Sequence, residues 1–309
     1  MSLGRAPLLP RRRYGKPLKW RGRDEWGELE VVEGELGLEL HFGSSALQGR
    51  INLEQPWRPL AEYAVSMLTL AALPERQSRQ DKTSLQVPDR PRVCLLGLGT
   101  GSLAWSYHRI LPQAELTAIE LRPGVIEVAT QLFGLGSLTA LRIIQGDASR
   151  ELVQLADHSQ TLVAIDLFTS TGMAPCLSSS DLWREVSRVL HPCGAIAVNS
   201  WSGDAEAFEK IFTEIKAHVC PQGDALIIDH EGFGNYIVLA SPRPLDREGC
   251  LTRATQIDQL LNEGTPQAHS YQSRRGPKKR DWESAAEEAG LSGEGVRERL
   301  RRAWKRAQS

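Results

Sequence analysis

The sequence contains no long uncharged hydrophobic run, so no stretch approaches the roughly 20 apolar residues that a membrane-spanning helix needs. It has no Cys-x-x-Cys pair, and its seven histidines never occur in H-x-x-x-H or H-E-x-x-H spacing. These absences exclude the common zinc-finger and metalloprotease signatures, and no metal is expected. The first residues, MSLGRAPLLPRRR, lack the apolar segment of a secretory signal.

Cysteine is scarce and odd in number. The five cysteines are Cys94, Cys176, Cys193, Cys220 and Cys250. An odd count, partly within predicted core strands, indicates reduced thiols rather than a disulfide framework. We therefore expect a cytoplasmic protein.

The net charge is close to zero, but the charges are unevenly distributed. The whole chain carries −1, residues 1–27 carry +6 and residues 270–309 carry +5, so residues 28–269 carry −12. Basic ends on an acidic body could bind nucleic acid or pack on the protein's own acidic surface. The ends contain no aromatic-basic module. The interpretation favoured here is a pair of solubilising, irregular tails, with nucleic acid as a possible but less favoured partner.

Between these ends the predicted secondary structure changes from short β-strands to a helix and then to alternating strands and helices. From Glu28, alternating apolar residues separated by glycines predict short antiparallel strands. Residues 59–73 have an apolar helical pattern that starts at a proline. The predicted organisation is a basic, flexible tail (1–27), N-terminal β-strands plus a helix (28–74), a linker (75–91), a Rossmann-like domain (92–243), and a loop with a basic helical extension (244–309).

The central region predicts regular alternation of strands and helices. The expected strands are 93–97, 115–120, 141–145, 161–166, 194–199, 225–229 and 235–240, and the expected helices are 102–111, 123–132, 148–157, 180–190 and 204–218. Such alternation indicates a mainly parallel sheet covered on both faces. The last two strands are joined by a short turn and should form an antiparallel pair. The predicted fold class is α/β: a seven-stranded class I methyltransferase-like Rossmann fold with a small N-terminal β-domain.

A glycine-rich loop follows the first of these strands. In VCLLGLGTGS, a buried strand leads into Gly97, Gly99 and Gly101, with Thr100 between the last two. Glycines at these positions let the chain turn tightly and let a ligand approach the backbone. The G-x-G-x-G spacing differs from the G-x-G-x-x-G of dinucleotide-binding proteins and is common in S-adenosylmethionine enzymes.

Acidic residues lie at the ends of the next three predicted strands. Glu120 ends the second, Asp147 follows the third and Asp166 ends the fourth. Ligands of such sheets bind beyond the carboxyl ends of the strands. Glu120 could accept both ribose hydroxyls of an adenosyl cofactor, and Asp147 could accept the adenine amino group. Structural alternatives are an exposed strand end for Glu120, a helix N-cap for Asp147 and a turn cap for Asp166.

The order of elements resembles the spermidine synthase family of polyamine aminopropyltransferases over about residues 28–241. The motifs that carry the resemblance are the FG…LQG…Y segment (Phe42, Gly43, Gln48, Tyr63), LGLGTGS, IELRPGVIEVA, GDA, and AIDLF followed by LSSSDLWREVSRVLHPCGAIAVN. The resemblance implies a small N-terminal β-domain before the transferase domain. It also implies S-adenosylmethionine or its decarboxylated form as co-substrate, Gln48 beside the cofactor, Asp166 as the catalytic group, and a homodimer.

The chain departs from that family where a polyamine would bind. Thr100 replaces an aspartate of the glycine loop, and Thr169 replaces the second aspartate after the fourth strand. Tyr63 is kept without the glutamate that normally follows it, and DHEGFGN replaces a tyrosine-containing segment. Burying a polycation requires several carboxylates.

The hypothesis is therefore a transferase of a methyl or alkyl group to an unidentified small-molecule acceptor, with Tyr63, Thr169 and Glu231 as candidate second-substrate residues. The alternatives are a genuine spermidine synthase and a non-catalytic adenosyl-binding protein with nucleic-acid-binding ends.

Overall fold

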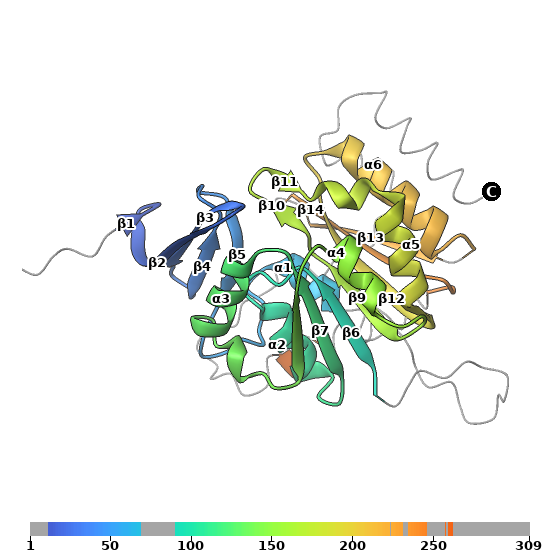
Figure 1. The fold of residues 1–309 in the computed structure, drawn as a ribbon, viewed down its shortest axis with the longest axis horizontal. Coiled ribbons are helices and arrows are strands. Elements are labelled where there is room, and N and C mark those ends of the chain that lie inside the picture. Colours follow the sequence, from blue (N-terminus) through green and yellow to red (C-terminus); the bar gives the residue numbers. More distant parts are fainter. Residues whose placement is uncertain are drawn as a thin grey trace, which may run out of the picture.

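The computed structural model describes residues 12–68, 90–222, 224–230, 234–245, 257 and 259–261. Two main sheets lie side by side along the molecule (Figure 1). An N-terminal antiparallel sheet contains β1 (Arg12–Arg13), β2 (Lys16–Asp24), β3 (Gly27–Glu33), β4 (Leu38–His41) and β5 (Leu47–Ile51) in sequential order. Helix α1 (Glu62–Leu68) connects it toward the second sheet.

The second sheet has seven strands in the order β13-β14-β12-β9-β6-β7-β8. Their bounds are β6 (Arg92–Leu96), β7 (Glu115–Glu120), β8 (Leu141–Gln145), β9 (Gln160–Ile165), β12 (Leu190–Trp201), β13 (Asp224–His230) and β14 (Asn235–Ser241). The β12-β9, β9-β6, β6-β7 and β7-β8 pairs are parallel, whereas β14 is antiparallel to both β12 and β13. The predicted fold class is confirmed, including the antiparallel pair at the end.

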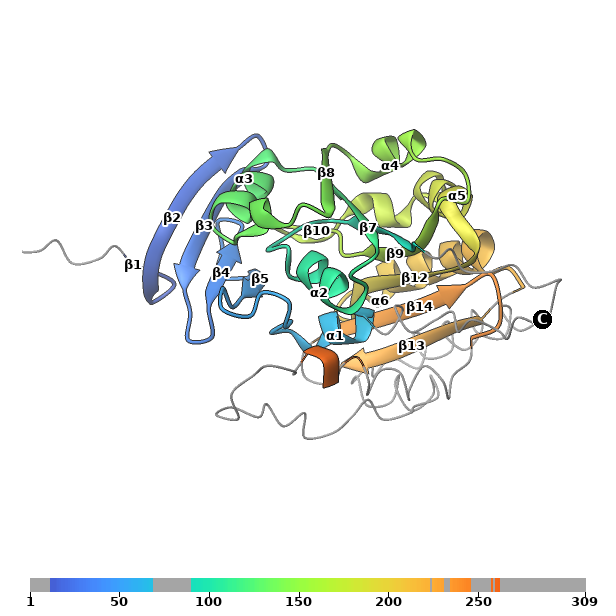
Figure 2. The same ribbon diagram turned by 90° about the horizontal axis from the view of Figure 1, so that it is seen from below.

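Helices cover both faces of this sheet (Figure 2). They are α2 (Ser102–Ile110), α3 (Pro123–Gln131), α4 (Ala148–Glu151), α5 (Ser180–Val189) and α6 (Ala205–Glu214), with a π-helical turn at Ile215–Val219 and 3-10 turns at Leu135–Ser137, Leu152–Gln154 and Pro175–Ser178. A two-stranded hairpin, β10 (Phe168–Thr169) and β11 (Gly172–Met173), follows β9. Among the described residues, no helix is long and apolar enough to cross a membrane.

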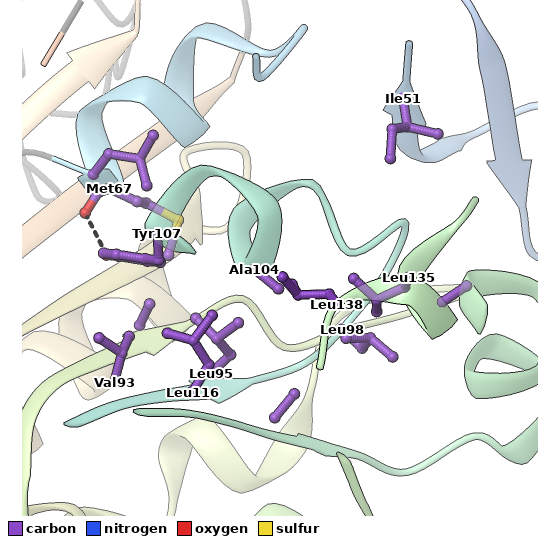
Figure 3. Packing of buried hydrophobic residues seen from close by; sticks show 14 of the residues in the cluster. Ile51, Met67, Val93, Leu95, Leu98, Ala104, Tyr107, Leu116, Leu135 and Leu138 are labelled. Atoms are coloured by element: carbon purple, nitrogen blue, oxygen red, sulfur yellow. Dashed lines mark hydrogen bonds between the residues drawn. The ribbon is translucent and has the colours of Figure 1, made fainter. Parts of the chain in front are cut away.

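Alternation along the strands divides the core in two. One cluster packs α1, α2 and α3 on the face that holds Leu95, Ala164 and Ala197, and the other packs α4, α5 and α6 on the face that holds Leu96 and Ile165. In the first cluster the Tyr107 hydroxyl donates to the Met67 carbonyl over 2.9 Å, which ties α2 to α1 (Figure 3). Burial on both faces explains the nearly continuous apolar runs of the central strands.

The expected irregular tail over residues 1–27 is wrong for the part that the structure describes. Residues 16–24 form β2, which pairs with β3 over nearly its whole length. Four basic residues pair with carboxylates on β3 and β4. Arg13 Nε lies 2.9 Å from Glu30, Lys16 Nζ 2.5 Å from Glu39, Lys19 Nζ 2.7 Å from Glu33, and Arg21 Nη2 2.6 Å from Glu28. These four basic side chains therefore pack on the protein's own acidic surface, the alternative that was not favoured.

Three further expectations concern the edges of the domains. The helix expected at 59–73 is observed as α1 over 62–68. The linker at 75–91 lies outside the described residues except for its last two positions. The C-terminal extension expected over 244–309 lies outside them except for residues 244, 245, 257 and 259–261.

Candidate active site

The glycine loop connects β6 to α2 at the carboxyl end of the sheet. Gly97, Gly99 and Gly101 all have positive φ, at 93°, 51° and 77°. At Gly97 a Cβ would lie 2.2 Å from the Asp166 carbonyl oxygen, so only glycine fits between β6 and the end of β9. A Cβ at Gly99 would meet no atom within 4 Å. The loop therefore presents open backbone at Gly99 and closely packed backbone at Gly97.

The carboxylate of Glu120 fixes this loop from the end of β7. Glu120 Oε2 accepts from the Leu98 N–H over 3.0 Å, and Oε1 accepts from the Arg122 N–H over 2.8 Å. Burial raises the pKa of Glu120, opposed by these N–H groups and by the charge of Arg122. A carboxylate has about four acceptor positions, so Glu120 retains capacity for a ligand hydroxyl. Glu120 thus has a structural task that the sequence did not reveal.

The N-terminal sheet contacts the same region at two points. Thr100 is buried against β5, where a Cβ at Gly49 would lie 2.9 Å from Thr100 Cγ2. Gln48, the neighbour of Gly49, is half-buried and lies where the register of β5 against β4 is irregular. The second contact is an ion pair in which Arg122 Nη2 lies 2.7 Å from Asp24 Oδ1.

Asp147 serves as the N-cap of α4. Its Oδ1 accepts from the Ser149 N–H over 2.8 Å, which is the structural alternative considered from the sequence. Asp147 follows β8, which pairs with β7 so that Gln145 stands opposite Glu120. The structure therefore places Asp147 at the same sheet edge as Glu120, with one carboxylate oxygen committed to the cap.

Asp166 follows β9 and is held by two donors. Asn199 Nδ2 donates to Asp166 Oδ1 over 2.9 Å, and the Tyr63 hydroxyl donates to Oδ2 over 3.3 Å. Burial raises the pKa of Asp166, whereas these two hydrogen bonds lower it. Burial and the charge of Asp166 raise the pKa of Tyr63 well above its ordinary value, so Tyr63 remains a neutral donor.

A second amide extends this network. Asn235 Nδ2 donates to Asn199 Oδ1 over 2.9 Å. An ionised Asp166 can only accept, so Asn199 must present its NH₂ group to it and its oxygen to Asn235. Sequence analysis identified Tyr63 and Asp166 but missed both asparagines. Asn199 lies at the end of the fifth predicted strand, and inspecting that strand end as the others were inspected would have found it.

The candidate second-substrate residue Thr169 bonds within its own hairpin and not to this network. The Thr169 hydroxyl donates to the Gly172 carbonyl and accepts from the Thr171 N–H, so it stabilises the β10–β11 hairpin. Glu231 lies outside the described residues. Within the described part of the chain, no three His, Cys, Asp or Glu side chains gather as a possible metal site.

Comparison with known proteins agrees with this geometry. Residues 95–198 match the family model described as a methyltransferase domain. A polyamine aminopropyltransferase from Chromobacterium violaceum is 26% identical over 235 residues, which cover 75% of this chain and 84% of the relative. These matches support the expected class of enzyme, a transferase of the S-adenosylmethionine type.

Solved structures with the same fold include a probable spermidine synthase and a methyltransferase-like protein. The crystal structure of a probable spermidine synthase from Corynebacterium glutamicum has a TM-score of 0.63 and 15% identity, covering 84% of this chain and all of that one. Human methyltransferase-like protein 13, solved in complex with SAH, has a TM-score of 0.55 and 20% identity, covering 69% of this chain and 98% of that one. The chain is thus similar to a polyamine aminopropyltransferase over 75% of its length, and residues 95–198 within that length match a methyltransferase domain.

Proposed function

We propose that this protein transfers a methyl or alkyl group from S-adenosylmethionine, or from its decarboxylated form, to a small acceptor that is not a diamine. One observation carries the proposal. Asp166, held by Tyr63 and Asn199, lies at the same edge of the sheet as the glycine loop and Glu120.

The cofactor half of the site is formed by the loop and the strand ends beside it. The open backbone at Gly99 would accept the close approach of the cofactor, and Glu120 would accept from the ribose hydroxyls. Leu121, which is exposed, offers apolar surface next to Glu120 for a purine face. The remaining oxygen of Asp147 is a candidate to accept from the adenine amino group. The side chain of Gln48 is a further candidate to bind the cofactor.

The acceptor half depends on Asp166. When bound, the cofactor supplies a sulfonium group whose neighbouring carbon is open to in-line displacement. Asp166 would align the nucleophile and receive its proton, and a raised pKa suits a general base near neutral pH. Replacement of Asp166 by Asn is expected to lower turnover by about 10²–10⁴-fold, the usual contribution of such a base.

A diamine does not fit the described residues around this base. The network contains one carboxylate, two amides and one neutral phenol. Thr169, at the position of the family's second aspartate, uses its hydroxyl within a hairpin. A distal ammonium would therefore lose its hydration without gaining a charged partner there.

The main alternative is a genuine spermidine synthase, which the names of the relatives favour. The test is an assay of the purified protein with putrescine and decarboxylated S-adenosylmethionine beside an authentic spermidine synthase. We expect turnover far below that control. Turnover within about tenfold, which corresponds to about 1.4 kcal/mol in the barrier, would contradict the proposal.

A non-catalytic, nucleic-acid-associated protein is the second alternative. The N-terminal basic side chains from Arg13 to Arg21 already have carboxylate partners within the sheet. We therefore place nucleic acid below a small-molecule acceptor. Salt-sensitive nucleic-acid binding without any turnover would favour this alternative.

A cytoplasmic location and a homodimer complete the proposal. The described cysteines Cys94, Cys176, Cys193 and Cys220 form no disulfide with one another, which suits a reducing compartment. The dimer rests on the family resemblance alone, and sedimentation velocity of the full chain tests it.

A further inference from the structure

An exposed tryptophan lies just beyond the Asp166 network. Trp201 is the last residue of β12, and its side chain is 46% exposed, whereas Asn199 on the same strand is 2% exposed. Val198 pairs with Ile165, so Asn199 stands beside Asp166. At about 3.3 Å per residue, Trp201 begins roughly 7 Å further along the strand.

Trp201 belongs to the same face of the sheet as the network. Side chains alternate along a strand, so residues 199 and 201 project to one side. Trp201 also pairs with Asn235 on β14, and Asn235 bonds Asn199. Asp229 pairs with Tyr236, the next residue of β14, which packs in the core on the opposite face.

Two glycines hold the indole ring in place. A Cβ at Gly203 would lie 2.5 Å from Trp201 Cζ2, and one at Gly234 would lie 3.4 Å from Nε1. The Ser202 N–H donates to the Gly234 carbonyl over 2.8 Å, which joins the two glycine-containing turns. The Trp201 backbone N–H contacts Met173 Sδ at 3.2 Å. The ring is therefore packed on one side and open on the other, and these neighbours carry no charge.

We propose that Trp201 forms the wall of the acceptor subsite and selects an amine that carries a flat apolar group. This inference rests on the proposed function and narrows the acceptor to one class. Asp166 receives the single amine proton, and the indole packs against the remainder of the molecule. Stacking of an aromatic group on the indole needs no second carboxylate in the site. An aromatic acceptor therefore fits a site in which threonines replace the family's amine-binding aspartates.

The experiment uses the full chain saturated with S-adenosylhomocysteine and three probe amines: phenethylamine, butylamine and putrescine. Dissociation constants are measured by ligand-observed NMR titration. We expect phenethylamine to bind about tenfold more tightly than butylamine. Trp201→Leu should remove about that factor, and Trp201→Phe should restore most of it. Trp26→Leu is the matched control, because Trp26 is similarly exposed, at 39%, in the turn between β2 and β3, and it should change nothing.

Three results would overturn the inference. The first is equal phenethylamine affinity in the wild type and Trp201→Leu. The second is no amine binding at all. The third is tighter binding of putrescine that is lost in Trp201→Leu, because it would make the indole a cation platform for a diamine. Binding of S-adenosylhomocysteine is measured in the same samples. Its absence would contradict the proposed function itself, whereas its presence without the expected amine selectivity would contradict only the assignment of Trp201.

Discussion

At the residue scale, the proposed function gives Glu120 a ligand-binding task in addition to its structural one. Its two oxygens already accept the Leu98 and Arg122 N–H groups, so replacing it affects the loop as well as any ligand. We expect Glu120→Ala to weaken S-adenosylhomocysteine binding by about 1.5–3 kcal/mol, the usual value for a hydrogen bond to a charged group. Calorimetric titration measures this loss, and chemical denaturation checks that the variant is folded.

A modified ligand separates the two tasks of Glu120. If the carboxylate binds the ribose, its loss should matter less for the 2′-deoxy analogue of S-adenosylhomocysteine, which lacks one of the hydroxyls. An identical loss with both ligands would show that Glu120 acts through the loop alone. Glu115→Gln, at the exposed start of the same strand, is the matched control.

Asp166 predicts a pH dependence of stability. Burial places its folded pKa above its unfolded value, so its contribution to stability is present below the unfolded pKa and is lost as pH rises through the folded pKa. Asn at this position does not ionise, so its unfolding free energy does not fall as pH rises through that pKa. The unfolding free energy of Asp166→Asn should therefore improve relative to wild type between about pH 4 and pH 7. Urea denaturation at both pH values measures it, and the opposite trend would contradict the burial argument.

Residue positions were predictable where a rule of the fold fixes them. The glycine loop, Glu120 and Asp166 follow from the rule that ligands lie at the carboxyl ends of parallel strands. Asn199 obeys the same rule, but its partner Asn235 depends on the antiparallel register of β14 against β12, which no local pattern encodes. Local patterns also could not reveal that the Thr169 hydroxyl forms hydrogen bonds within the β10–β11 hairpin.

At the scale of elements, the docking of the N-terminal sheet rests on a buried ion pair. The Asp24 and Arg122 side chains are 6% and 8% exposed, and Arg122 also donates to the Gly27 carbonyl and lies over the Phe42 ring. Asp24→Ala leaves this guanidinium without its carboxylate and should cost about 3–5 kcal/mol of unfolding free energy. Chemical denaturation measures the loss.

A double variant tests whether the loss of stability comes from leaving Arg122 without a carboxylate partner. Asp24→Leu combined with Arg122→Met replaces both charges by apolar groups and should recover much of the stability, because no charge remains unpaired. If Asp24→Ala alone costs less than about 0.5 kcal/mol, in the range of an exposed pair, the sheet does not dock through this contact.

Strand β2 is the element that the sequence analysis misjudged. Its density of arginine and lysine suggested an irregular tail, yet Lys16, Lys19 and Arg21 each pair with a carboxylate of β3 or β4. Deleting residues 1–24 should therefore expose β3 as an unprotected edge and make the protein aggregate. Deleting residues 1–11 keeps every described strand and serves as the control. A soluble, stable protein after the longer deletion would contradict this assignment.

At the scale of the whole molecule, the proposed function gives the chain the nucleotide half of a spermidine-synthase-like site and a different amine half. The alternation of strands and helices predicted the sheet and its layers because burial on both faces leaves a clear apolar pattern. The packing of the N-terminal sheet against the glycine loop was not predictable, since it joins residues such as Asp24 and Arg122 that lie far apart in sequence. The acceptor likewise depends on side chains brought together only in the folded molecule.

The most direct test of this account is a calorimetric titration of the wild-type protein with S-adenosylmethionine and with its decarboxylated form. The account predicts saturable binding of at least one of them at a single site per chain, weakened in Glu120→Ala. Absence of binding by both ligands to folded protein would contradict the central claim that the glycine loop and the strand-end carboxylates form an adenosyl-cofactor site.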